Sequence, residues 1–246
     1  MYTYRLTLSY DGSRYNGWQR QGNTPNTIQE KIETLLSRLL EEEIEVSGSG
    51  RTDAGVHAAG QVVSFHTVSH PDPTILLKQM RQYLPEDIGA LSLEEAAPRF
   101  HARLNATGKT YTYRVWNSEE PNVFGRKYMY SYPAPLNIEA MRTAAADLLG
   151  THDYMSFCAN KRMKKSTVRT VSAITLEQSG SELLFTFTGD GFLYHMVRIL
   201  VGTLLEVGAG ERDCHSMPAL LSARDRSQAG ALAPAHGLRL EQVFYN

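Results

Sequence analysis

The sequence predicts an α+β protein made of two similar halves, residues 1–105 and 106–246. Segments that alternate bulky and polar residues, as strands do, lie between segments whose apolar residues recur at helical spacing. The order of these segments in the first half returns in the second, and Tyr-Thr-Tyr-Arg occurs in the first strand of each half. The repeated order is the stronger observation, because a match this short can arise by chance. Two such halves each have a sheet face to cover, and halves that face each other form a cleft.

In the first half, the expected order is strand, helix, strand, strand, helix, strand. These elements span residues 2–10, 27–40, 44–47, 61–65, 74–83 and 88–93. The apolar residues of the first helix share one face, and Thr27 and Glu30 can form a capping box at its start. The second helix follows Pro73, a residue that suits the first turn of a helix.

In the second half, the expected elements span residues 109–116 (strand), 138–149 (helix), 171–177 and 183–188 (strands), 192–207 (helix), 216–223 (short helix) and 238–244 (strand). Gly150 and Gly208 follow the two longer helices, where glycine commonly ends a helix. The segment QSGSE between the two middle strands predicts a hairpin. The second half therefore repeats the element order of the first.

Composition narrows the classes of function. Of the 246 residues, 42% are hydrophobic and 21% charged, and no apolar run is long enough to span a bilayer. The N-terminus has no secretion-signal pattern, so we expect a cytoplasmic protein without a membrane anchor. The two cysteines, Cys158 and Cys214, lie far apart, and the histidines have no metal-ligand spacing. We therefore expect neither a disulfide framework nor a metal site.

A net charge of −1 at pH 7 excludes a protein that coats nucleic acid indiscriminately, but it leaves room for a local basic surface. Residues 161–169 suit phosphate contacts, and a solvated charged loop is the alternative. Their basic side chains are Lys161, Arg162, Lys164, Lys165 and Arg169. Residues 10–21 interleave aromatic side chains with Arg14 and Arg20. That pattern suits RNA, although a packed Ω-loop has a similar composition.

The first candidate for chemistry is Asp53, in the glycine-spaced segment 48–60. The glycines permit tight backbone turns and the close approach of another molecule. Arg51 and His57 flank the aspartate, and nearby positive charge favours the ionised form of a carboxyl group. An ionised carboxylate suits a nucleophile rather than a general acid. The alternative is an aspartate that caps its own turn.

The second candidate is Arg198, in the apolar segment 192–207. Apolar residues fall all round the helix axis, so we expect a buried helix with His195 and Arg198 in its middle. A buried arginine cannot lose its charge, and therefore it needs an anion. Asp53 is one candidate for that anion, and a structural ion pair with Glu206 or another carboxylate of the protein is the alternative.

Two tyrosines complete the candidate site. Tyr111 and Tyr113 occupy alternate positions of one strand, so their side chains share a face and either can stack on a nucleobase. Aromatic residues of strands also pack in cores, which is the alternative for both.

The segment GRTDAGVHA resembles the signature around the catalytic aspartate of the bacterial tRNA pseudouridine synthase A family. Further blocks resemble that family in the same order along the chain, among them YDGSRYNGWQRQ, FHARLNATGKTYTYRVWN, HDYMSF, FLYHMVRILVGTLLEVG and GLRLEQVFY. The resemblance implies an enzyme that converts uridines of the tRNA anticodon stem-loop to pseudouridine without a metal or organic cofactor. It also implies a homodimer whose subunits have two ferredoxin-like βαββαβ halves about a pseudo-two-fold axis. The resemblance further implies that mainly antiparallel sheet lines a central RNA-binding cleft.

The resemblance also implies roles for single residues. Asp53 matches the nucleophile, and Arg198 matches the arginine that pairs with it. Tyr111 matches the residue that packs against the target base. Arg51 matches a loop arginine at the RNA, and Leu238 resembles an apolar contact to the base.

One position departs from the pattern: Asn16 stands where many relatives have histidine, which affects an RNA contact rather than the chemistry. Two other functions remain as alternatives. One is a tRNA-binding or tRNA-folding protein of the same fold without catalysis. The other is an aspartate-based hydrolase of glycosidic bonds, which ordinarily needs a second carboxylate.

Overall fold

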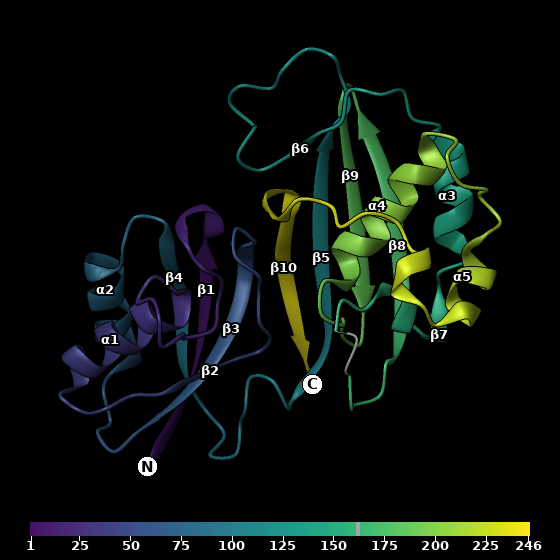
Figure 1. Cartoon of the computed structure of the whole chain (residues 1–246). Coiled ribbons are helices and arrows are strands. Elements are labelled where there is room, and N and C mark those ends of the chain that lie inside the picture. Colours follow the sequence, from purple (N-terminus) through teal and green to yellow (C-terminus); the bar gives the residue numbers. More distant parts are fainter. Residues whose placement is uncertain (161–162) are drawn as a thin grey trace. The chain divides into compact units, whose positions relative to one another are not determined.

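The computed structural model describes residues 1–160 and 163–246, which form two compact units. The first unit contains Met1–Thr107 and Arg239–Asn246, and the second contains Gly108–Leu238. Each unit combines helices with a mainly antiparallel sheet (Figure 1), so the α+β class is confirmed. The sequence places a boundary after residue 105 and the last strand in the second half. In the structure most of that strand groups with the first unit, as part of Arg239–Asn246.

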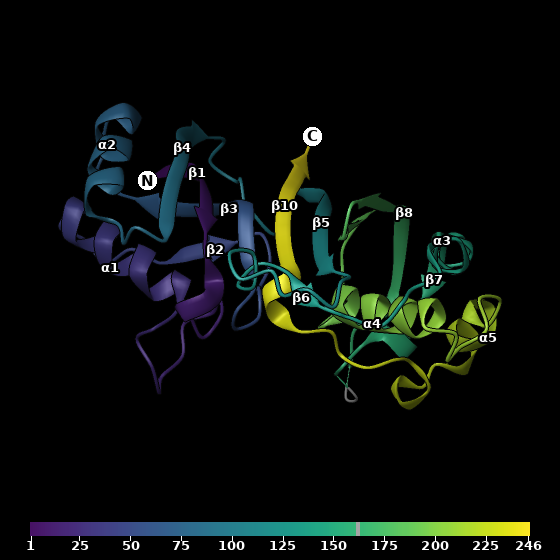
Figure 2. The same ribbon diagram turned by 90° about the horizontal axis from the view of Figure 1, so that it is seen from above.

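The first unit has the ferredoxin-like order of elements. They are β1 (Tyr2–Tyr10), α1 (Ile28–Leu40), β2 (Val46–Gly48), β3 (His57–Thr67), α2 (Pro73–Tyr83) and β4 (Ile88–Ala96). The sheet order is β4-β1-β3, and β1 is antiparallel to both neighbours. Along the outer edge of β3, β2 pairs at one end, and β10 (Leu238–Tyr245) pairs in parallel at the other. Figure 2 shows α1 and α2 on one face of this sheet.

Local sequence explains why these elements form. Alternate residues of β1, from Tyr4 to Tyr10, are buried against the helices, as the period of a half-buried strand requires. The α1 helix begins where the Thr27 hydroxyl accepts a hydrogen bond from the Glu30 backbone N–H. This bond is one half of the expected capping box.

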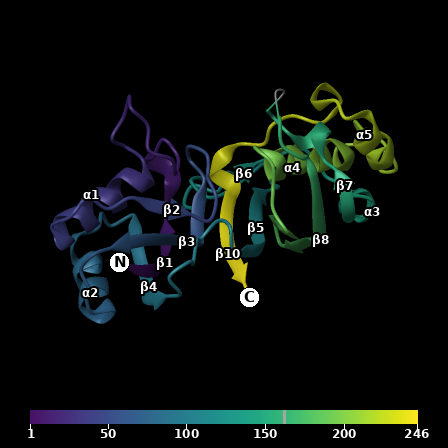
Figure 3. The ribbon, with the colours of Figure 1, turned by 90° about the horizontal axis from the view of Figure 1, so that it is seen from below.

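The second unit has the sheet order β5-β9-β8-β7, all antiparallel, with β6 added in parallel to β5. Its elements are β5 (Ala106–Trp116), β6 (Tyr130–Ser131), α3 (Ile138–Ala146), β7 (Gly150–Asp153), β8 (Val168–Ser179), β9 (Glu182–Gly189), α4 (Met196–Gly208) and α5 (Met217–Ala223). The expected hairpin joins β8 to β9 with Gly180 in the left-handed region (φ +59°). Figure 3 shows α3 and α4 on one face of this sheet.

The α4 helix is the core of the second unit. Every residue of it except Arg198 and Glu206 is buried, as its apolar sequence predicts. A Cβ atom at Gly202 would lie 1.8 Å from the Ala231 carbonyl oxygen, so the chain after α5 runs directly against the helix. Glycine is needed here for this close approach.

Two expectations in the second unit are wrong. Helix α4 begins four residues later than expected, because His195 has a left-handed backbone (φ 63°) that a helix cannot include. His195 therefore caps the helix and Arg198 lies in its first turn, not in its middle. The sequence also gave no sign of β7, whose first residue is Gly150 (φ +103°), the residue expected only to end the preceding helix.

Among the described residues, no helix is both long and apolar enough to cross a membrane. The same residues contain no group of three or more His, Cys, Asp or Glu side chains placed to hold a metal ion. Both cysteines are free thiols, with Cys158 buried.

Candidate active site

Asp53 lies half-buried in the loop of residues 49–56, between β2 and β3. Its neighbours Thr52 and Val56 are buried. The backbone N–H of Val56 donates to the carbonyl oxygen of Asp53 (3.1 Å), and Gly55 adopts the left-handed conformation (φ +80°) that this turn requires. Residues 53–56 at the end of the loop thus form a tight turn, and Asp53 is its first residue.

The segment after β1 packs against this turn. The N–H of Trp18 donates to the carbonyl oxygen of Thr52 (3.0 Å). Gly17 (φ +94°) lies so close that a Cβ atom there would be 2.8 Å from that same oxygen. Tyr15 and Trp18 are buried, so the aromatic side chains of residues 10–21 pack within the protein, whereas Arg14 and Arg20 are exposed.

The arginines of the first unit differ in how their charges are compensated. Arg14 forms an ion pair with Asp87 (2.6 Å), and Arg20 forms ion pairs with Glu30 (2.7 Å) and Glu33 (3.3 Å). Arg51 is exposed, and its Nε atom donates to the neutral amide oxygen of Gln19 (2.8 Å). This bond of Arg51, two residues before Asp53, therefore goes to a neutral group, whereas carboxylates largely neutralise the charges of Arg14 and Arg20.

The expected basic segment 161–169 is described from residue 163 onward, so Lys161 lies outside the described residues. Lys164 and Lys165 are exposed. They line a polar pocket of about 540 Å³ together with Asp153 and Arg224, which form an ion pair (3.0 Å).

The two tyrosines of β5 have different environments. Tyr113 is fully buried, and its hydroxyl donates to the Pro234 carbonyl oxygen (2.8 Å). Burial raises the pKa of Tyr113, although the positive charge of Arg198 opposes this rise. Tyr111 keeps 8% of its surface exposed, and its ring meets Phe192 edge to face, with centroids 5.3 Å apart. Both tyrosines are therefore buried, but only Tyr111 keeps a small part of its surface accessible.

Arg198 is half-buried at the start of α4 and is tethered to the chain after α5. Its Nε atom donates to the Ala233 carbonyl oxygen (2.7 Å), and the Ala233 N–H donates to the Arg198 carbonyl oxygen (3.2 Å). Glu206, its alternative partner, is held by Arg212 (2.8 Å) and by the Ala231 N–H (3.0 Å). Both oxygens of that carboxylate are therefore used elsewhere.

Leu238 is buried, and it directly follows Gly237 at the start of β10. A Cβ atom at Gly237 would lie 2.6 Å from the Tyr113 ring, so glycine lets this segment approach β5. Within the second unit, the structure therefore places Arg198 and the segment that leads into Leu238 around Tyr113.

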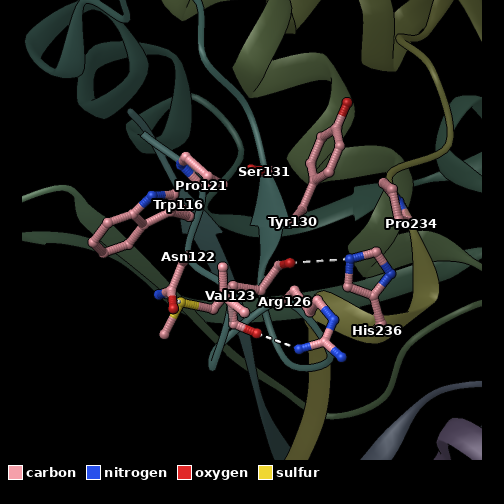
Figure 4. A pocket seen from close by; sticks show the side chains of 10 residues that line it. Trp116, Pro121, Asn122, Val123, Arg126, Tyr130, Ser131, Pro234 and His236 are labelled. Carbon is pink, nitrogen blue, oxygen red and sulfur yellow. Dashed lines mark hydrogen bonds between the residues drawn. The ribbon is translucent and has the colours of Figure 1, made fainter. Parts of the chain in front are cut away.

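A second pocket, of about 380 Å³, was not expected from the sequence (Figure 4). Its lining is mainly apolar and includes the rings of Trp116, Tyr130 and His236. Its polar groups bond within the unit: His236 Nε2 contacts the Met129 carbonyl oxygen (3.0 Å), and Arg126 donates to the Val123 carbonyl oxygen. Eight of its ten lining residues come from residues 116–131, and Pro234 and His236 complete it.

The chain matches one protein family, described as tRNA pseudouridine synthase, over residues 7–105 and 144–246. A protein named tRNA pseudouridine synthase A 2, from Bacillus cereus strain ZK / E33L, is 45% identical over the full length of both chains. The proteins named A 2 and A 1 of Bacillus cereus strain ATCC 10987 are 44% and 45% identical, covering at least 98% of each chain. A solved Cbf5-Nop10-Gar1 complex covers 96% of this chain and 48% of its own at 13% identity. Its TM-score of 0.40 is too low to support an inference.

Proposed function

Because the chain belongs to the tRNA pseudouridine synthase family, we propose that it converts uridines of tRNA to pseudouridine, with Asp53 as the nucleophile. The segment GRTDAGVHA around Asp53 carries the proposal. It lies inside the matched region, and its glycines shape the turn that holds the aspartate half-buried.

The reaction breaks the bond between N1 of uracil and C1′ of ribose, turns the base, and joins C5 to C1′. C5 loses a proton and N1 ends with one, so the product is an isomer and the reaction consumes no cofactor. The base must first leave the helical stack, which costs about 2–4 kcal/mol. Stacking on an aromatic side chain and contacts with phosphate groups offset this cost.

Asp53 must be ionised to act by either of two routes. The carboxylate attacks the sugar or the base directly, or it removes a ribose proton while the uracil departs. In both routes water competes for the cleaved sugar, so the site must exclude water. We assign to Arg198 the pairing with this carboxylate. The tether to Ala233 supports that role, because it fixes the position of the guanidinium group.

Substrate contacts are proposed for three further residues. Tyr111 packs against the flipped uracil, through the small part of its side chain that is accessible. Arg51 contacts the RNA, which its exposure supports. Leu238 supplies an apolar contact to the base.

The proposed partner is the anticodon stem-loop of tRNA, bound by a cytoplasmic homodimer. Lys164 and Lys165 are proposed to contact phosphates, and their exposure supports this. The same role is proposed for Lys161, which lies outside the described residues. Arg14 and Arg20 are weaker candidates, because their ion pairs already compensate their charge.

The test is tritium release from tRNA that carries uridine labelled at C5. Asp53→Asn should reduce the rate at least about a thousandfold, the order of loss seen when a nucleophile is removed. Asp147→Asn, at the end of α3, is the matched control and should retain activity. Release at the normal rate by Asp53→Asn would refute the assignment.

The unaltered protein also separates the two alternative functions. If it were a tRNA-binding protein without catalysis, it would shift tRNA in a gel but release no tritium. A hydrolase would release free uracil.

A further inference from the structure

A buried network of uncharged hydrogen-bonding groups lies beneath the loop of Asp53. We propose that Tyr10, Thr52 and Gln61 are positioning residues, which hold the loop at Gly50 and Thr52 and thereby aim the Asp53 carboxylate. This inference rests on the proposed role of Asp53 as nucleophile.

The network links β1, the loop and β3. The Tyr10 hydroxyl lies 2.9 Å from the Thr52 hydroxyl, and Gln61 Nε2 donates to the Gly50 carbonyl oxygen (2.9 Å). Gln61 Nε2 also lies 3.4 Å from the Tyr10 hydroxyl, and Gln61 Oε1 accepts from the Ser49 hydroxyl (2.6 Å). Between Tyr10 and Thr52 either hydroxyl can be the donor, because a hydroxyl oxygen can accept hydrogen bonds while its own O–H donates one.

All four side chains of the network are buried. Gln61 and Ser49 have no exposed surface, Tyr10 keeps 4% and Thr52 keeps 6%. Apolar side chains of similar size would fill this space without the cost of burying polar groups. A fully bonded polar network instead selects one arrangement, because each donor must find its acceptor.

The arrangement reaches Asp53 through Thr52. The Thr52 side chain is held by Tyr10, and its carbonyl oxygen is held by the Trp18 N–H (3.0 Å). That carbonyl lies in the peptide plane that ends at the Asp53 Cα atom. The Asp53 carbonyl oxygen is held in turn by the Val56 N–H (3.1 Å). With both planes fixed, the direction of the Cα–Cβ bond is set, and only two side-chain torsions remain.

The Tyr10 hydroxyl keeps its proton at neutral pH. Burial raises the pKa of Tyr10 to about 12, against the opposing effect of its hydrogen bonds with Thr52 and Gln61. The phenol therefore remains a donor throughout the neutral range, and its removal should not alter the pH profile of the reaction.

The test compares Tyr10→Phe, Thr52→Val and Thr52→Ser with unaltered protein in the tritium-release assay. The first two remove one hydroxyl each, and we expect kcat to fall about ten- to a hundredfold, because small displacements of a reacting group cost that much. KM for tRNA should stay within about twofold, since none of the three is proposed to touch RNA. Thr52→Ser keeps the hydroxyl and should restore most of kcat.

Tyr4→Phe is the matched control. Tyr4 is another buried tyrosine of β1, and its hydroxyl donates to the Pro71 carbonyl oxygen (2.9 Å), away from the loop. Its loss should lower the melting temperature as Tyr10→Phe does but leave kcat unchanged.

Unchanged kcat in Tyr10→Phe and Thr52→Val, beside an active unaltered enzyme, would overturn the positioning role alone. Equal losses of kcat in Tyr4→Phe would also overturn it, because they would show a general effect of stability. An unaltered protein that releases no tritium would instead refute the proposed function itself.

Discussion

The loop of Asp53 and the first turn of α4 hold a charged side chain in different ways. Asp53 has a short side chain on a turn whose backbone is fixed by hydrogen bonds at Thr52 and Val56. Arg198 has a long side chain on a regular helix, and a bond from Nε to the Ala233 carbonyl oxygen tethers it near its end.

The difference shows where each group is vulnerable. A short side chain follows its backbone, so substitutions beneath the loop should displace the carboxylate. A long side chain has several torsions, so the helix alone does not place its charge. For Arg198 the tether matters more than the helix.

Among the tests of this comparison, the largest effect is expected when the bond between Arg198 and Ala233 is disturbed. Arg198→Lys keeps the positive charge but replaces the planar fork of donors with one ammonium group, which cannot both bond Ala233 and present a paired edge to a carboxylate. We expect kcat to fall about a hundredfold. Arg142→Lys is the control, since Arg142 also donates from Nε to a backbone carbonyl oxygen, that of Leu176 (3.2 Å). Normal kcat in Arg198→Lys would show that charge alone suffices.

A smaller effect is expected when the backbone of the loop is displaced. Gly17→Ala puts a Cβ atom 2.8 Å from the Thr52 carbonyl oxygen on a backbone with φ +94°. The free energy of unfolding should fall by about 2 kcal/mol, and kcat by about tenfold. Urea unfolding and tritium release measure the two quantities.

Gly22→Ala is the control for that substitution. It lies in the same segment, and an added Cβ atom there meets nothing within 4 Å. If Gly17→Ala behaved like Gly22→Ala in both measurements, close packing of this segment would not position the loop.

The smallest effect concerns binding rather than catalysis, and it contrasts exposed with compensated charges. Lys164→Gln with Lys165→Gln should lower the slope of log Kd for tRNA against log salt by about one per lysine. Arg14→Gln with Arg20→Gln should change it less, because Asp87 and Glu30 already neutralise these arginines. Gel shifts at several salt concentrations measure both slopes. Equal changes would show that the ion pairs open when RNA binds.

Sequence patterns predicted the regular elements best where the signal is local. The alternation of residues 2–10 predicted β1 as Tyr2–Tyr10, and the cap at Thr27 placed the start of α1 to within one residue. The pattern failed at α4, where the apolar run continues through His195 although the helix does not. Hydrophobic periodicity does not report a left-handed residue at a helix start.

For the candidate site, the sequence marked the groups that carry chemistry but not the groups that support them. Asp53 stands out in its glycine-spaced loop. Tyr10 and Gln61 look like ordinary strand residues, and they lie 51 positions apart along the chain. Only pairing of β1 with β3 brings them together beneath the loop.

The sequence by itself therefore determined most of the helices and strands and their order, the glycine-shaped turn of Asp53, and the family resemblance. These depend on contacts between near neighbours or on the letters themselves. The tertiary structure decided which polar side chains are compensated. It paired Arg14 with Asp87, 73 positions away, and tethered Arg198 to Ala233, 35 positions away. A charge is compensated by whatever folding places within a few ångströms of it, and that distance is not encoded in any local pattern.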